Sequence, residues 1–264
     1  MGRDAPMSCP QFFVSREILP VFHHSTEYQH TLRPSKMSMS GTQERKQALI
    51  EHKVITDVLP GNLDLSYDLK VEWPETTLDK AGVELGREET QPEPTLSLSP
   101  TPSKPLNNLV LIMTDADLMM DNDTYFGQVR HWLVTNITTS STGALSLASA
   151  STISPYVGPA PLPNYIYSRP HRYVFILASS SSPVEITADD LRELQKPYVA
   201  AMAGNQEAQD IKDRWGFSAQ ALVEKKGLKV EAVNFMRVGG TLKSAVANAG
   251  LMAQGMGNKV RSLL

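Results

Sequence analysis

The amino-acid sequence predicts a mainly β protein, a single antiparallel β-sandwich with short helices at its periphery and toward its C-terminal end. Residues 63–73 alternate apolar and polar side chains over eleven positions, which is the period-two pattern of a strand with one face in water. Residues 109–114, 131–137 and 173–178 are short apolar runs rich in β-branched side chains, which is typical of strands in a sandwich core. With 264 residues, the chain is long enough for one large β-sandwich domain.

The chain divides into three parts by composition. Residues 1–40 show neither the helical nor the strand period, so we expect a flexible leader there. A true start at Met37 or Met39 and a mitochondrial transit peptide are alternatives for this segment. Residues 41–240 form the expected folded domain. Residues 241–264 keep the helical spacing of apolar side chains but contain three glycines, which indicates a marginal amphipathic tail.

Several local elements are expected in the first part of the domain. Residues 42–50 predict a short helix with Thr42 as its N-cap. Residues 88–105 contain five prolines, so any strand there is expected to be short and at a sheet edge. Residues 138–154 are almost wholly Ser, Thr, Ala and Leu and predict an exposed loop.

Two helices and a last strand are expected after the core strands. Thr187 is followed by two aspartates and caps a predicted helix that extends to residue 203. Ser218 and Gly227 flank the second predicted helix. Residues 230–238 are apolar and β-branched and predict the last strand.

The composition excludes several classes of protein. Lys and Arg total 25 against 28 Asp and Glu, a net charge of -3, so nucleic acid is not an expected partner and any anion site must be local. Cys9 is the only cysteine, which excludes a disulfide within the chain and favours a reducing compartment. The expected location is the cytoplasm, and the mitochondrion is the second choice. No apolar run approaches the ~20 residues that a transmembrane helix needs.

Separated segments carry the residues from which we expect a binding site. An apolar run ends in an Asp-Ala-Asp segment that begins at Asp115, and His131 opens another apolar run. A Gly-Pro-Ala-Pro loop, residues 158–161, precedes the Pro-His-Arg-Tyr segment of residues 170–173. In order and spacing these segments resemble the Asp-Pro-Asp-x-Pro loop, the histidine-led strand, the glycine-proline loop and the Gly-x-His-Arg element of the phosphatidylethanolamine-binding protein family. Residues 234–240 are similar to fungal members of the carboxypeptidase Y inhibitor type.

The resemblance implies a protein that binds a small anionic or amphiphilic ligand, such as phosphate, a phospholipid headgroup or a metabolite, at one end of the sandwich. It also implies a possible protein partner, because members of the family inhibit serine carboxypeptidases or regulate signalling kinases. Fold likeness does not decide among these functions. The ligand-binding residues that it implies are Asp115, Asp117, Phe126, His131, Gly158, Pro159, Ala160, Pro161, His171 and Tyr173.

The chemistry of these residues suits an anion. A phosphate or carboxylate needs hydrogen-bond donors, which imidazoles supply. Asp115 is expected to hydrogen-bond a histidine and to fix its tautomer, so that one N–H points inward. Tyr173 faces the same side of its strand as His171, whereas Arg172 faces away and is expected to be structural. For Asp117, a turn-forming role and a pocket role both stay open.

The sequence also departs from the family pattern. Ala116 and Met119 replace the two prolines of the acidic loop, and Ala160 replaces the second glycine of the rim. Together with Met120 they predict a more apolar ligand than a bare headgroup. Gly158 is expected to let the rim loop approach the ligand.

Two other functions stay open. One is a fungal secondary-metabolite isomerase, dehydratase or cyclase that works by acid/base catalysis, because imidazole titrates near neutral pH. Its catalytic groups would be Asp115, His131, His171 and Tyr173. The other is docking to a membrane surface or a protein through the tail, residues 241–264. No cofactor is expected, and the remaining histidines lack the spacing of metal ligands.

Overall fold

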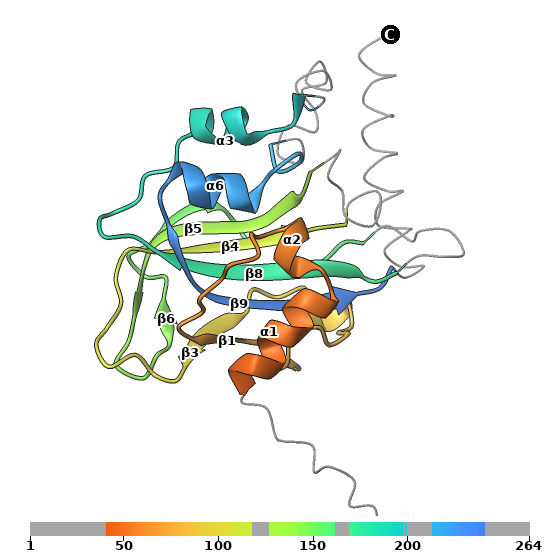
Figure 1. The fold of residues 1–264 in the computed structure, drawn as a ribbon, viewed down its shortest axis with the longest axis horizontal. Helices are drawn as coiled ribbons and strands as arrows, with labels where there is room; N and C mark the ends of the chain where they lie inside the picture. The colour runs from red at the N-terminus through yellow and green to blue at the C-terminus, as the bar shows by residue number, and fades with distance from the viewer. Residues whose placement is uncertain (1–40, 118–126, 162–168, 198, 200–212, 241–264) are drawn as a thin grey trace, which may run out of the picture. The chain divides into compact units, whose positions relative to one another are not determined.

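The computed structural model describes residues 41–117, 127–161, 169–197, 199 and 213–240, which all belong to one compact unit, residues 39–264 (Figure 1). The predicted leader, the predicted tail and the candidate ligand residue Phe126 lie outside the described residues. Met119 and Met120, from which a more apolar ligand was predicted, also lie outside them.

Two antiparallel sheets pack face to face. The large sheet has the strand order β6-β5-β4-β8-β9, and β7 also pairs with β5. Its strands are β4 (Leu109–Asp115), β5 (Val129–Thr139), β6 (Leu145–Ser146), β7 (Ser151–Ser154), β8 (His171–Ser179) and β9 (Lys229–Val238). The small sheet has the order β2-β1-β3 and consists of β1 (Asp68–Glu72), β2 (Thr77–Leu78) and β3 (Thr95–Ser99).

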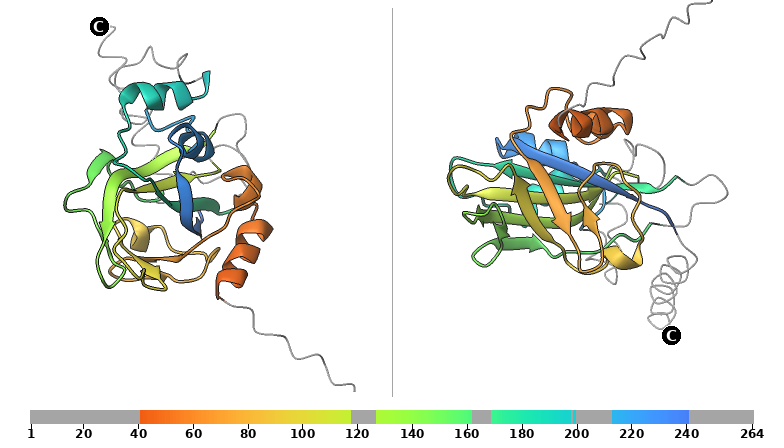
Figure 2. Two further views of the ribbon diagram at one scale, coloured as in Figure 1. Left: turned by 60° about the vertical axis from the view of Figure 1, so that its left-hand side comes forward. Right: turned by 90° about the horizontal axis from the view of Figure 1, so that it is seen from below.

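Helices cover the face of the large sheet that points away from the small sheet (Figures 1 and 2). Their apolar side chains pack with one face of the large sheet in a first core cluster, while the small sheet packs with the other face in a second cluster. The protein is therefore layered as small sheet, large sheet and helices. The helices are α1 (Gly41–Glu51), α2 (Val54–Asp57), α3 (Ala188–Leu194) and α6 (Ala219–Lys225), and a 3₁₀ turn, η1, spans Glu88–Thr90.

A buried amide joins the two sheets. Asn234 on β9 is fully buried among apolar side chains of the second cluster. Its side-chain nitrogen donates to the carbonyl oxygens of Leu69 at 2.7 Å and Leu78 at 3.2 Å, on β1 and β2. Because buried polar groups need partners, these bonds fix how the small sheet sits on the large one.

The predicted fold class is confirmed, and so are most of its elements. The three apolar runs are β4, β5 and β8, and the last predicted strand is β9. The proline-rich segment holds one short edge strand, β3, besides the turn η1. Thr187 caps α3 through a reciprocal capping box with Asp190, and the Ser218 hydroxyl accepts from the N–H of Ala221 at the start of α6. Cap residues that satisfy free N–H groups therefore identified both helix starts.

Four expectations about element bounds were wrong. Of residues 63–73 only β1 is a strand, because the N–H groups of Ser66 and Tyr67 donate to the Glu231 carbonyl instead of a neighbouring strand of the small sheet. Residues 138–154 are not simply a loop, since they contain β6 and β7, which pair with β5. The helix capped by Thr187 ends at Leu194, well before residue 203. Helix α1 begins at Gly41, so Thr42 lies inside the helix and is not its N-cap.

Candidate functional site

A β-bulge in β5 positions His131. Met113 on β4 pairs with Trp132, but the next residue, Thr114, pairs with Arg130, so His131 is the extra residue between them. A bulge of this kind turns a side chain away from the regular alternation and is common beside functional sites. The His131 ring lies against the Tyr173 ring, with centroids 5.1 Å apart and planes 88° apart.

Asp115, His171 and Tyr173 come from the same end of the large sheet as His131. Asp115 is the last residue of β4 and pairs with Tyr173 near the start of β8. Its Oδ2 lies 2.9 Å from Nδ1 of His171, the first residue of β8. The His171 and Tyr173 rings are stacked 6.4 Å apart. The structure therefore brings these four predicted site residues into one group, here called the imidazole cluster.

Hydrogen bonds fix which ring nitrogen carries the proton. Nδ1 of His131 lies 2.8 Å from the carbonyl oxygen of Val157, and a carbonyl can only accept, so Nδ1 is the donor. Nδ1 of His171 likewise donates to the Asp115 carboxylate. In the neutral form of each ring, Nε2 is then an acceptor. The expected bond between Asp115 and a histidine is present. Because Nδ1 of each ring is the donor in these bonds, Nε2 becomes a second donor only when the ring is protonated. The inward N–H expected from the sequence therefore needs a protonated ring.

The cluster is buried, and burial sets its electrostatics. Asp115, His131, His171 and Tyr173 are at most 6% exposed. Burial lowers the pKa of His131 below its ordinary value of 6.5, although the charge of Asp115 opposes this. Burial alone would raise the pKa of Asp115, but the charge and hydrogen bond of His171, together with His131 and the Asp117 N–H, outweigh burial, so the net pKa is lowered. At neutral pH the cluster therefore combines an ionised carboxylate with a neutral His131.

The Tyr173 hydroxyl is the least satisfied group of the cluster. Tyr173 is fully buried, and its Oη makes no hydrogen bond of good geometry among the residues that the structure describes. The Asp115 carboxylate and the Ala160 backbone lie close enough to this hydroxyl to affect its pKa. Burial, and then the negative charge of Asp115, raise the pKa of this hydroxyl well above its usual value, so it stays a neutral donor. A buried hydroxyl without a partner costs about 1–3 kcal/mol, so such a group calls for an explanation such as a ligand or a water.

Asp117 is occupied by a different interaction. Its Oδ2 accepts from Nε of Arg172 at 2.9 Å and its Oδ1 from Nη2 at 2.7 Å. Nη1 of Arg172 donates to Asp57 at 2.9 Å and to the carbonyl oxygen of His52 at 2.7 Å. Arg172 thus joins β8 to α2 and the turn before it, as expected for a structural residue. A ligand contact for Asp117 remains only a prediction.

The rim loop, residues 157–161, is held by the cluster on one side and by Gln91 on the other. The Val157 N–H donates back to the His131 carbonyl at 3.0 Å. A Cβ on Gly158 would lie 2.9 Å from Cα of Gln91, and Nε2 of Gln91 donates to the Pro159 carbonyl at 2.9 Å. The glycine is therefore explained by packing against Gln91, and the expected reason, approach to a ligand, is not needed. Among the other predicted rim residues, Pro161 is buried and Ala160 is half-buried.

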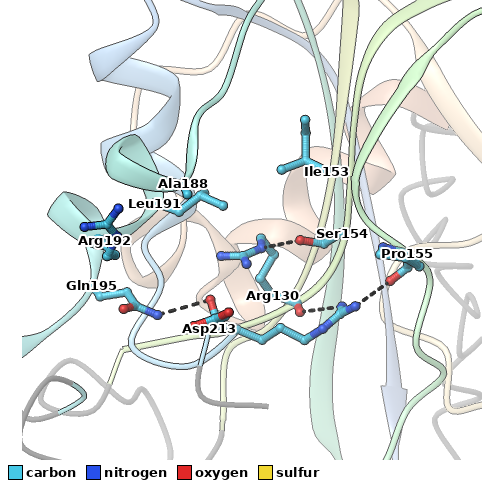
Figure 3. Close-up of a pocket in the computed structure, with 10 residues that line it drawn as sticks. Arg130, Ile153, Ser154, Pro155, Ala188, Leu191, Arg192, Gln195 and Asp213 are labelled. Carbon is cyan, nitrogen blue, oxygen red and sulfur yellow. Dashed lines mark hydrogen bonds between the residues drawn. The ribbon is translucent and has the colours of Figure 1, made fainter. Parts of the chain in front are cut away.

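Sequence reasoning missed the partners that hold the cluster. The Val157 carbonyl leaves no trace in the side-chain pattern, because any residue type supplies it. Gln91 stands in a proline-rich connector and no motif marks it. A cavity of about 580 Å³ was also missed, and it lies beside Arg130 and α3 instead of at the cluster (Figure 3). Among the described residues, no group of three or more His, Cys, Asp or Glu side chains is placed to hold a metal ion.

The sandwich of a small and a large sheet, with an acid and two imidazoles at the ends of adjacent strands, defines a known class of protein. The sequence model of the family described as phosphatidylethanolamine-binding protein matches residues 69–215, which is more than half of the chain. The chain belongs to this family. The described residues contain no helix with the length and apolar character needed to cross a bilayer.

Individual relatives are more distant. The uncharacterized protein YLR179C of Saccharomyces cerevisiae is 29% identical over 124 residues, which cover 43% of this chain and 60% of that protein. The chain thus matches less than two thirds of the length of this curated relative. The solved carboxypeptidase Y inhibitor, complexed with its cognate proteinase, has a TM-score of 0.55 and 18% identity over 75% of this chain and 96% of its own. A phosphatidylethanolamine-binding protein from Plasmodium vivax has a TM-score of 0.51 and 20% identity over 74% and 97%. Likenesses at these identities show the fold.

Proposed function

We propose that this protein binds a small anionic or amphiphilic ligand at the imidazole cluster, with the anionic group accepting from Tyr173 Oη and from protonated His131. The observation that carries the proposal is the fully buried Tyr173 hydroxyl, which has no partner among the described residues and lies beside the His131 ring. A ligand oxygen would supply the missing acceptor. Asp115 acts as a positioning residue, because it holds the His171 ring through Nδ1.

The charge on the ligand follows from the charge of the cluster. Asp115 is ionised, so an anion is repelled unless at least one imidazole is protonated. His131 takes up that proton most readily when an anion is already near, because the anion stabilises the imidazolium. Phosphate, a phosphorylated headgroup and a carboxylate metabolite share this chemistry, and the choice among them stays open.

Calorimetric titration of the wild-type protein with phosphate and with phosphorylethanolamine, at about pH 6, tests the proposal. We expect saturable binding that Tyr173→Phe and His131→Gln each weaken by about tenfold, the loss of one good hydrogen bond. Tyr173→Phe should leave the melting temperature close to that of wild type, because the hydroxyl that it removes makes no hydrogen bond of good geometry to the described residues. His52→Gln, in a histidine outside the cluster, is the matched control. If Tyr173→Phe and His131→Gln bind as tightly as the control, the cluster is not the site.

The other functions that the resemblance implies stay predictions. Proteinase inhibition belongs to the carboxypeptidase Y inhibitor, and the likeness to that protein is one of fold. Acid/base catalysis would use the same four residues, and a neutral His131 has the protonation state that a general base needs.

A further inference from the structure

The cavity beside Arg130 lies on the helix side of β5, whereas the imidazole cluster lies toward the small sheet. Arg130 directly precedes His131, but the bulge directs the two side chains to different places. The guanidinium carbon of Arg130 lies 5.4 Å from the ring centre of Phe217, which belongs to the helix-side core cluster. The residues that line the cavity are Arg130, Ile153, Ser154, Pro155, Ala188, Leu191, Arg192, Gln195, Asp213 and Arg214 (Figure 3).

Arg130 is a buried cation whose hydrogen bonds are incomplete. It is only 3% exposed, and its Nε donates to the Ser154 hydroxyl at 2.7 Å. Its Nη1 is buried and has no hydrogen-bond partner in the described part of the chain. Figure 3 shows the Arg130 side chain between Ser154 and the α3 residues Leu191 and Arg192. Removing a charge from water without full pairing is costly, so an arginine in this state calls for an acceptor.

The charges around Arg130 do not supply that acceptor. Burial, followed by the charge of Arg214, lowers the pKa of Arg130 to about 10, and Asp213 offsets only part of the effect. Arg214 donates to the carbonyl oxygens of Arg130, His131 and Pro155 at 3.2, 3.1 and 3.0 Å. Arg192 forms an ion pair with Asp189. Within the part of the chain that the structure describes, two arginines thus lie close together with one aspartate nearby, which is an excess of positive charge.

The cavity has the size and lining of a small-molecule site. Its volume of about 580 Å³ falls within the range of roughly 300–1,000 Å³ that is usual for such sites. Ile153, Pro155 and Leu191 contribute apolar side chains, whereas the guanidinium groups are polar. A ligand that fits both parts has an anionic group and an apolar body.

We propose that this cavity is a second ligand site, which binds a small phosphomonoester or carboxylate with an apolar body, its anionic oxygen accepting from Nη1 of Arg130. The site goes beyond the function proposed for the imidazole cluster and does not depend on it. Arg130 Nε, held by Ser154, and the Phe217 ring orient the guanidinium before the ligand binds. The ligand would supply the acceptor that Nη1 lacks, and this bond would offset the cost of burying the cation.

The test uses phenyl phosphate, inorganic phosphate and benzoate in calorimetry on the full chain with the double substitution His131→Gln/Tyr173→Phe, so that the imidazole cluster no longer contributes. We expect phenyl phosphate to bind to this parent, and Arg130→Gln to weaken it by at least tenfold. Arg130→Lys keeps the charge but not the planar pair of donors, so its affinity for phenyl phosphate should lie between that of the parent and that of Arg130→Gln. Leu191→Trp should also block binding, because it fills the cavity without changing the charge. The control is Lys225→Met, which removes a cation on α6 that pairs with Glu193 outside the cavity.

The outcomes separate the two sites. If wild type binds phenyl phosphate and the His131→Gln/Tyr173→Phe variant does not, the second site is overturned and the cluster proposal stays intact. Equal affinity in a folded Arg130→Gln variant and its parent would also overturn it. Equal affinities for phenyl phosphate and inorganic phosphate would refute the claim that the site prefers a ligand with an apolar body. Binding of benzoate would show that the site accepts a carboxylate as the anionic group. If Arg130→Gln fails to fold, Leu191→Trp decides, and unchanged affinity there counts against the cavity.

Discussion

Replacing Asp117 by alanine should lower the free energy of unfolding by about 3–5 kcal/mol, the range for breaking a buried ion pair from one side. The Arg172 guanidinium donates two of its hydrogen bonds to this carboxylate, and both side chains are less than a tenth exposed. The alanine variant leaves a buried cation with Asp57 and one carbonyl as its remaining partners. Urea denaturation followed by circular dichroism measures the change.

An exposed ion pair supplies the matched control for Asp117. Asp189→Ala removes a carboxylate from Arg192, and both side chains of this pair are at least 70% exposed. Exposed pairs contribute about 0–1 kcal/mol, so this variant should unfold almost as wild type does. A loss of less than about 1 kcal/mol for Asp117→Ala would contradict the structural role assigned to Arg172 and would reopen a ligand role for Asp117.

Affinity for sulfate at the imidazole cluster should rise by up to about tenfold per pH unit as the pH falls from about 7 to about 5. Sulfate is a useful probe because its own charge is constant over this range. Burial lowers the pKa of His131 below 6.5, so the ligand-free ring is neutral at pH 7. An anion favours the imidazolium, so binding takes up a proton, and linkage makes the affinity increase toward acid. Calorimetry at several pH values measures the slope.

His131→Gln should flatten this slope, because glutamine does not titrate. Arg130 stays charged over the same range, so sulfate bound at the second site would add a constant background. The stability of the ligand-free protein should change in the opposite direction. Since the folded-state pKa of His131 is lowered, the unfolded chain takes up its proton first, and the free energy of unfolding falls as the pH drops below 6.5. A sulfate affinity that is independent of pH in wild type would remove His131 from the proposed chemistry.

The sequence predicted the strands well where one physical pattern dominated. The apolar runs of β4, β5 and β8 are buried on both faces, which is the environment that short runs rich in β-branched side chains predict. The prediction of one strand over residues 63–73 was wrong at its start. The side chains there alternate as in a strand, but the backbone N–H groups of Ser66 and Tyr67 donate to the Glu231 carbonyl. Strands β6 and β7 were missed because Ser and Thr are polar, whereas their pairing is decided by the free edge of β5.

The candidate site was predictable in part for a similar reason. The motif order placed Asp115, His131, His171 and Tyr173 together, and the alternation along β8 correctly separated Arg172 from Tyr173. The sequence could not show the bulge at His131, because a bulge is a mismatch between two strands and not a property of one. The sequence does not mark Arg130, because no motif includes it and because its cavity depends on α3, which is distant along the chain.

Nitrogen-15 NMR of the histidine rings tests the central claim most directly, since it reports which ring nitrogen carries the proton. In ligand-free protein at about pH 7.5, His131 should be neutral with its proton on Nδ1, because that atom donates to the Val157 carbonyl. On addition of sulfate at about pH 5.5, Nε2 of His131 should become protonated as it meets the anion. A neutral His131 with its proton on Nε2, or a ring whose protonation does not respond to sulfate, would contradict this account of the site.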